Sequence, residues 1–181
     1  MRRDKKAWIG ILALIGVIAP VSNTANALST KNNLLIKSSI DNAAALKAAF
    51  LVSKAERLKG FENKTYLTDL ELKQLLSLVG FKGNQLVVAW AIAKKESNGR
   101  PLAFNGNHKT GDSSYGMFQI NMIDSLGPDR RDKFDLNSNA ELFNPVKNAE
   151  IVYYMSQGGD DWSSWKGITQ KTREWMLKFP K

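Results

Sequence analysis

Residues 86–97 read Leu-Val-Val-Ala-Trp-Ala-Ile-Ala-Lys-Lys-Glu-Ser, and the first eight of them are apolar without interruption. Asn84 stands where its side chain can cap a helix that begins with this run. A helix that is apolar on every side has to be surrounded by other elements. We therefore expect residues 86–97 to form the central helix of a compact domain.

Helical patterns lie on both sides of this run. Residues 41–59 carry apolar side chains at helical spacing, and Thr68-Asp-Leu-Glu71 fits a capping box at the start of a leucine-rich helix. Asn144-Pro145 is typical of a helix start, and a last short helix is expected over residues 169–178. The sequence thus predicts a mainly α, single domain with little or no sheet.

A long polar segment, residues 98–114, interrupts the helical pattern. It consists largely of Gly, Asn, Asp, Ser and Lys, with hardly any residue suited to a core. Long loops in compact domains are typically functional. We expect this segment to be a surface loop that lines a cleft and contains a small β-hairpin.

The N-terminus has the pattern of an export signal. After a positively charged start, residues 7–21 are uncharged and almost wholly apolar, and Ala25-Asn26-Ala27 fits a cleavage site. Fifteen apolar residues span about 22 Å as a helix, less than the roughly 30 Å hydrocarbon core of a bilayer. Residues 1–27 are therefore predicted to be a cleaved signal peptide. Since no charge follows until Lys31, an uncleaved membrane anchor through residues 7–27 is the alternative.

The composition excludes several kinds of chemistry. The chain has no cysteine and a single histidine, His108, so we expect no thiol catalysis, no metal site and no cofactor. Its 26 Lys and Arg residues outnumber 17 Asp and Glu, and the formal net charge of +9 favours anionic partners. The basic residues are scattered along the chain, so nucleic acid is not an expected partner. The functions that remain possible are catalysis by carboxylate groups, catalysis by hydroxyl groups, and binding without catalysis.

Glu96 is the residue that we expect to carry the chemistry. Its helical neighbours include Ile92 and Ala93, so it lies on an apolar face in the last turn of the predicted helix. Burial and the helix dipole both disfavour the charged carboxylate, as a general acid working near neutral pH requires. The alternative is a solvated glutamate that Lys94 and Lys95 balance.

The order of motifs along the chain resembles the lysozyme-like superfamily. Glu96-Ser97, followed after the polar loop by Ser114-Tyr-Gly-Met-Phe-Gln-Ile-Asn121, is similar to a signature of animal-type lysozymes and bacterial lytic transglycosylases. The transglycosylase-type domain of phage tail and virion-associated lysins is the closer match. Its further elements occur here in order, at residues 80–83, 142–149 and 162–165.

The resemblance covers about residues 65–178 and implies one lysozyme-like catalytic domain over that range. Residues 28–64 are then a linker plus the amphipathic helix, with little structure expected over residues 28–40. Outside the domain, residues 1–27 remain the signal peptide or anchor. We expect an exported monomer of the periplasm, the cell envelope or the medium, or a virion-associated protein if a phage encodes it.

The resemblance implies cleavage of the β-1,4 bond between N-acetylmuramic acid and N-acetylglucosamine in peptidoglycan, with Glu96 as the general acid. Tyr115, Gly116 and Gln119 match the motif that lines the substrate groove. In this interpretation Gln119 hydrogen-bonds an N-acetyl group, and Gly116 lets the backbone approach the sugar. Alternatively, Tyr115 belongs to the core and Gly116 to a turn.

Ser114 stands where animal-type lysozymes carry their second carboxylate. A hydrolase normally needs two carboxylates. A lytic transglycosylase needs only one, which protonates the leaving group and then deprotonates the muramic C6 hydroxyl. We therefore expect a lytic transglycosylase that produces 1,6-anhydro-muramic ends. A lysozyme with Asp112 as its second carboxylate is the alternative, and a non-catalytic peptidoglycan-binding or assembly protein is the alternative from another class.

Overall fold

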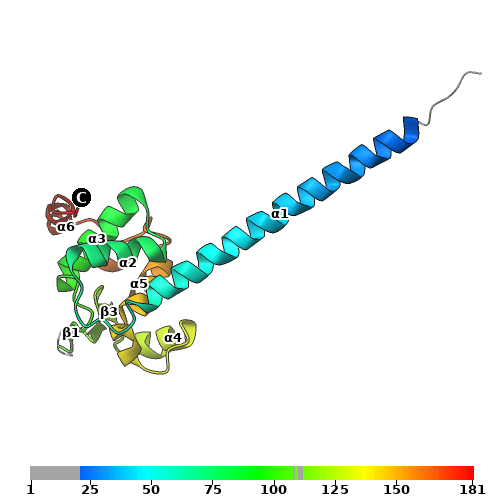
Figure 1. Ribbon diagram of the computed structural model, residues 1–181. Coiled ribbons are helices and arrows are strands. Elements are labelled where there is room, and N and C mark those ends of the chain that lie inside the picture. The colour runs from blue at the N-terminus through cyan, green and yellow to red at the C-terminus, as the bar shows by residue number, and fades with distance from the viewer. Residues whose placement is uncertain (1–20, 108, 110–111) are drawn as a thin grey trace, which may run out of the picture. The chain divides into compact units, whose positions relative to one another are not determined.

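The computed structural model describes residues 21–107, 109 and 112–181, with side chains from residue 28 onward (Figure 1). The α-helices are α1 (Val21–Lys59), α2 (Asp69–Val79), α3 (Gly83–Ser97), α4 (Leu126–Lys133), α5 (Pro145–Met155) and α6 (Gln170–Met176). Short strands and 3-10 helices lie between them, namely β1 (Phe104–Asn105), β2 (Ser114–Tyr115), β3 (Ile120–Asn121), η2 (Asn139–Phe143) and η3 (Ser163–Trp165). The mainly α fold class is confirmed.

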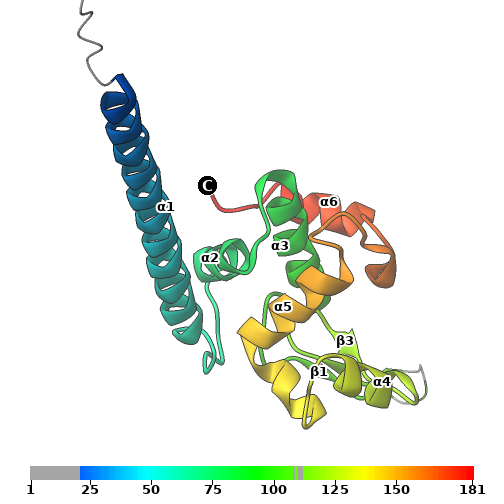
Figure 2. The ribbon, with the colours of Figure 1, turned by 90° about the vertical axis from the view of Figure 1, so that its right-hand side faces the viewer.

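Helix α3 is the centre of the compact unit formed by residues 49–181. Its residues 88–94 are all buried, and Trp90 and Ile92 are completely inaccessible. α3 packs against α2 and α6, and α2 packs against α5, so other helices lie around it (Figure 2). The prediction that the uninterrupted apolar run forms a buried central helix is therefore confirmed.

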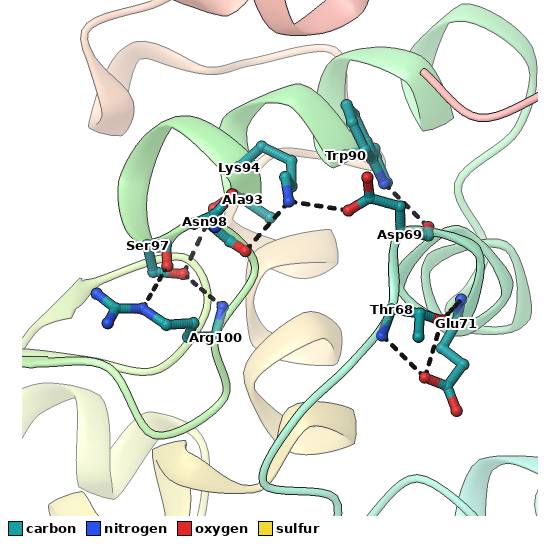
Figure 3. A network of polar contacts seen from close by, with 9 residues as sticks. All are labelled: Thr68, Asp69, Glu71, Trp90, Ala93, Lys94, Ser97, Asn98 and Arg100. Carbon is teal, nitrogen blue, oxygen red and sulfur yellow. Dashed lines mark hydrogen bonds and ion pairs between the residues drawn. The ribbon is translucent and has the colours of Figure 1, made fainter. Parts of the chain in front are cut away.

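Helix α2 begins at the predicted capping box. The Thr68 hydroxyl accepts a hydrogen bond from the Glu71 backbone N–H, and Glu71 Oε2 accepts one from the Thr68 backbone N–H at 2.8 Å (Figure 3). The helix ends at Gly80, whose φ of 143° is a conformation that glycine adopts at little cost. Both ends of this helix are thus specified by local residues.

Replacing Glu71 with glutamine is expected to lower the free energy of unfolding at pH 7 by about 0.5–1 kcal/mol. Hydrogen bonds from Lys64 and then from Thr68 lower the pKa of Glu71 from 4.5 to about 2. Glutamine can keep the capping box but loses the ion pair with Lys64. Since the folded-state pKa lies below the unfolded one, this stabilisation is complete above about pH 4.5 and disappears as the pH falls towards 2.

Urea unfolding of both proteins at pH 7 and near pH 2.5 measures this difference. The gap between wild type and Glu71→Gln should narrow markedly at the lower pH. A gap of equal size at both values would show that the charge of Glu71 contributes nothing to stability.

The polar loop contains the expected hairpin within a small antiparallel sheet. β2 lies between β1 and β3, with Asn105 opposite Ser114 and Ser114 opposite Asn121. This register brings three polar residues to one end of the sheet. The sheet follows directly after the end of α3 in the chain, as Figure 2 shows.

The prediction of little structure over residues 28–40 was wrong, because α1 runs without a break from Val21 to Lys59. No glycine or proline occurs within that range, so no residue breaks the helix. The helix predicted over residues 41–59 is present, but its apolar residues Leu46 and Phe50 are exposed. Their spacing indicated a helix, and it did not indicate a buried face.

Helix α4 was not expected from the sequence. Its residues are mostly charged, and Pro128 occupies its first turn, where a missing N–H costs nothing. The segment continues into Leu136, which is buried.

Across residues 21–107, 109 and 112–181, no helix is both long enough and apolar enough to cross a membrane. Residues 1–20, which hold most of the predicted signal peptide or anchor, lie outside the described residues, as does His108.

Candidate active site

A cavity of about 570 Å³ lies at the C-terminal end of α3. It brings together four of the predicted site residues, which are Glu96, Asp112, Ser114 and Gln119. The other residues that line it are Lys95, Asn105, Asn121, Ser164, Trp165, Lys166, Thr169 and Lys171. The cavity is thus built from the end of α3, the small sheet, and the segment from η3 to α6.

Glu96 lies in the last turn of α3, and its side chain is 25% exposed. Lys95 Nζ lies 2.9 Å from Glu96 Oε1 and also donates to the backbone carbonyl of Trp165 at 2.9 Å. Within the described residues, no hydrogen bond to Glu96 Oε2 is present. The carboxylate is therefore held on one side by Lys95 and is open to a ligand on the other.

The apolar surroundings expected for Glu96 are present only in part. Its side chain is partly buried, but Lys95 balances its charge, as the alternative interpretation held. Lys94 does not take part, because its ammonium group pairs with Asp69 Oδ1 at 2.8 Å (Figure 3).

Ser97 joins the end of α3 to the segment that precedes β3. Its hydroxyl donates to the carbonyl of Met117 at 2.7 Å and accepts from the backbone N–H of Arg100 at 3.0 Å. Arg100 Nε in turn donates to the Ser97 carbonyl at 2.9 Å (Figure 3). These bonds fix the turn that follows Glu96.

Ser97→Ala is expected to lower the free energy of unfolding by about 1–3 kcal/mol, because the buried carbonyl of Met117 loses a hydrogen-bond donor. Chemical denaturation measures the loss. Ser77→Ala on the exposed side of α2 is the matched control, and its effect should stay within about 0.5 kcal/mol. Equal effects of the two substitutions would mean that the Ser97 bonds do not hold this turn.

Gln119 has a left-handed backbone, with φ of 50°. The amide nitrogen of its side chain is hydrogen-bonded to the protein. Its Nε2 donates to the carbonyls of Gly116 at 2.9 Å and Ala103 at 3.2 Å. Both N–H groups of the amide are therefore engaged. Its carbonyl Oε1 is the atom that remains to accept a hydrogen bond from a ligand.

Ser114 and Asp112 approach the cavity from the sheet and from the loop before it. Ser114 is buried between its neighbours Asn105 and Asn121 in the sheet. Asn121 Oδ1 accepts bonds from the backbone N–H groups of Ser113 and Ile123, each at 3.1 Å, and so shapes this edge. Asp112 brings a second carboxyl group to the cavity that contains Glu96.

The structure does not bring Tyr115 and Gly116 to this cavity. The Tyr115 ring is half-buried against Phe104 and Phe143, with ring centroids 4.9 Å and 5.4 Å away. Gly116 is buried with φ of 74°, and a Cβ there would lie 2.3 Å from Asn148 Nδ2. The close approach that Gly116 permits is to α5 and η2, so the structure matches the core and turn interpretation of these two residues.

Asn148, which the sequence did not single out, organises the loop around Gly116. Its side chain is fully buried, and its Oδ1 accepts from the Phe118 backbone N–H at 3.2 Å. Its Nδ2 donates to the carbonyls of Tyr115 at 3.2 Å and Leu142 at 3.0 Å. Asn148 is a polar residue within the family-like element at residues 142–149, and this was the signal that could have identified it.

The sequence also gave no indication of the cavity wall that η3 and the start of α6 form. Lys166 and Lys171 lie 70 or more residues from Glu96 in the chain, and no local pattern marks them. Trp165 belongs mainly to the core, and its indole N–H donates to the Phe118 carbonyl at 2.8 Å. On the side of the sheet, the guanidinium group of Arg130 in α4 donates to the carbonyl of Asn121 in β3. Burial lowers the pKa of Arg130.

A second hollow of similar volume, about 560 Å³, lies between the last turns of α1, the end of α2 and Tyr153. No Asp or Glu lines it, so it lacks the carboxyl group on which the expected glycosidic cleavage depends. Across the part of the chain that the structure describes, no group of three or more His, Cys, Asp or Glu side chains could hold a metal ion.

Comparison with known proteins places this chain in a family. A family described as a lysozyme-like domain matches residues 73–167. A curated acetyl esterase of Caldicellulosiruptor saccharolyticus is 40% identical over 50 residues, which are 26% of this chain, and the match spans only 19% of that protein's length. No solved structure matches the chain significantly. Since the family match covers more than half of the chain and includes every predicted site residue, this protein belongs to the lysozyme-like domain family.

Proposed function

We propose that this protein is a lytic transglycosylase that cleaves the β-1,4 bond between N-acetylmuramic acid and N-acetylglucosamine in peptidoglycan. Membership of the lysozyme-like family supports a peptidoglycan-acting enzyme that breaks glycosidic bonds. The observation that carries the finer proposal is the position of Glu96, which lines the cavity beside Ser114 and Gln119.

Glu96 performs both proton transfers in this mechanism. The protonated carboxyl group gives its proton to the glycosidic oxygen as the bond to muramic C1 breaks. The resulting carboxylate then takes the proton of the C6 hydroxyl, whose oxygen forms the new bond to C1. The products are a free 4-hydroxyl on one fragment and a 1,6-anhydro ring on the other, no water is consumed, and Glu96 is protonated again.

Neighbouring residues orient the carboxyl group and the sugar. Lys95 holds Glu96 Oε1, and Oε2 is then the oxygen that exchanges the proton with the substrate. Gln119 Oε1 accepts the N–H of an N-acetyl group, because its own N–H groups are already bonded to the protein. Ser114 occupies the sheet position at which a hydrolase of this family would carry its second carboxylate.

A lysozyme is the second candidate, since Asp112 lines the same cavity as Glu96. In that mechanism Asp112 acts as nucleophile or as base for a water molecule, and the product is a reducing muramic end. The two mechanisms therefore differ in their products and in their need for Asp112.

Mass spectrometry of fragments released from purified peptidoglycan by the full-length chain separates the two candidates. Fragments with 1,6-anhydro-muramic ends, still produced by Asp112→Asn, support the transglycosylase. Reducing ends that disappear with Asp112→Asn would establish the lysozyme instead. Asp132→Asn on the exposed side of α4 is the matched control for loss of one carboxylate. A folded protein that releases no fragments from several wall types would favour a non-catalytic wall-binding role.

We also propose that the protein acts outside the cytoplasm, because residues 1–27 have the pattern of a signal peptide or anchor. N-terminal sequencing of the exported protein tests this. A chain that begins at Leu28 supports a cleaved signal, an intact N-terminus in the membrane fraction supports an anchor, and retention in the cytoplasm contradicts export.

A further inference from the structure

We infer that Lys166 and Lys171 form a subsite for the carboxylate groups of the peptide stems on the glycan strand. This inference rests on the proposed function and deepens it, since it names a chemical feature of the substrate that the cavity selects. It concerns the wall of the cavity that η3 and the first turn of α6 provide.

The lysines that line the cavity differ in whether their ammonium groups have a bonding partner. Lys95 is engaged, because it pairs with Glu96 and donates to the Trp165 carbonyl. Within the described residues, the ammonium groups of Lys166 and Lys171 have neither an ion pair nor a hydrogen bond. Both side chains are exposed, so they stand at the edge of the cavity with their charge available.

The backbone that carries Lys166 is well anchored. The indole N–H of Trp165 donates to the Phe118 carbonyl at 2.8 Å, and that of Trp162 donates to the Gly159 carbonyl at 2.9 Å. Lys166 is the C-cap residue of η3 and has a left-handed backbone with φ of 61°. The turn therefore places the start of its side chain at this wall of the cavity.

The chemistry of the substrate matches this placement. In peptidoglycan the lactyl group of each muramic residue carries a peptide, and the peptide bears free carboxylates beside the sugar chain. A strand in the cavity would therefore present anionic groups to its edges. Two unpaired ammonium groups at one edge are complementary to them, and such rim charges act on association and on salt dependence.

Kinetics on two forms of one substrate test the inference. The substrate is a preparation of soluble glycan strands with uncross-linked peptide stems, from which phosphate polymers have been removed. One portion is kept native. In the other portion the stem carboxylates are converted to neutral amides with ammonia and a carbodiimide. At about 150 mM ionic strength, where charges act over about 8 Å and distant charges of the protein are screened, wild type should show a KM about 3- to 10-fold lower for the native strands. The Lys166→Gln/Lys171→Gln double variant should lose this preference.

Two further variants separate charge from structure. Lys166→Arg/Lys171→Arg keeps both charges and should keep the preference. Lys37→Gln/Lys59→Gln removes two exposed charges of α1 and should also keep it. Equal KM values for the two substrates with wild type, or a preference that survives in the glutamine double variant, would overturn the inference.

A binding measurement keeps the inference testable if no cleavage is found. Failure of wild type to cleave either form contradicts the proposed function alone. Co-sedimentation of Glu96→Gln with insoluble native and amidated walls then decides about the lysines. Stronger binding to the native wall, lost when Lys166 and Lys171 are also replaced by glutamine, supports the subsite, and equal binding to both walls rejects it.

Discussion

Glu96→Gln is expected to reduce the rate of peptidoglycan cleavage by about 10²–10⁴-fold, the range by which general acid–base catalysis contributes to enzyme rates. Glutamine keeps the size of the side chain but can neither give nor take the proton. In the proposed mechanism one carboxyl group performs both transfers, so the loss should lie towards the upper end of this range. The initial rate of fragment release by the full-length chain measures it.

The fold should survive this substitution, because glutamine keeps the size of the side chain and Lys95 keeps its hydrogen bond to the Trp165 carbonyl. Circular dichroism of both proteins checks this point. Glu150→Gln on the exposed side of α5 is the matched control and should retain the wild-type rate. A folded Glu96→Gln protein with wild-type activity would remove Glu96 from the mechanism.

Gly116→Ala is expected to lower the free energy of unfolding by about 2–5 kcal/mol, because overpacking costs about 1–3 kcal/mol and a left-handed non-glycine residue about 1–2. The new Cβ would lie 2.3 Å from Asn148 Nδ2 and 2.4 Å from the carbonyl oxygen of Leu142. Neither neighbour can move freely, because Asn148 is held by its own hydrogen bonds and the Leu142 oxygen belongs to the backbone. Urea unfolding at pH 7 measures the loss.

Gly167→Ala separates the two contributions. Gly167 also has a left-handed backbone, with φ of 68°, but no atom lies within 4 Å of its Cβ position. That variant should lose only about 1–2 kcal/mol. If both alanine variants lose the same amount, the contact between Gly116 and Asn148 is not rigid, and Asn148 does not position the loop before β3 as we describe.

Much of the fold could be read from local signals. The uninterrupted apolar run predicted that α3 is buried, and the capping box marked the start of α2. The expectation of little structure over residues 28–40 failed because polar composition was taken as a sign of an irregular chain. Polar residues are compatible with a helix where no glycine or proline interrupts it, and α1 contains neither.

Local patterns also identified part of the candidate site. Glu96 stands out because a carboxylate after an apolar run is unusual, and the motif that resembles the lysozyme-like superfamily pointed to Gln119. Gly116 belongs to the same motif, yet its role depends on which surface faces it, and that surface belongs to Asn148. A local sequence pattern can therefore identify the residues of a site, but it does not determine which distant residues they contact.

Residues near one another in the chain were enough to predict the central helix, the hairpin in the polar loop, the family resemblance and the choice of Glu96. The position of Lys166 and Lys171 at the edge of the cavity that contains Glu96, and the packing role of Gly116, emerged from the folded structure. A cavity wall is made by packing between distant segments, and no local pattern records that packing. Here a hydrogen bond from Lys95 Nζ to the Trp165 carbonyl joins two segments that lie far apart in the chain.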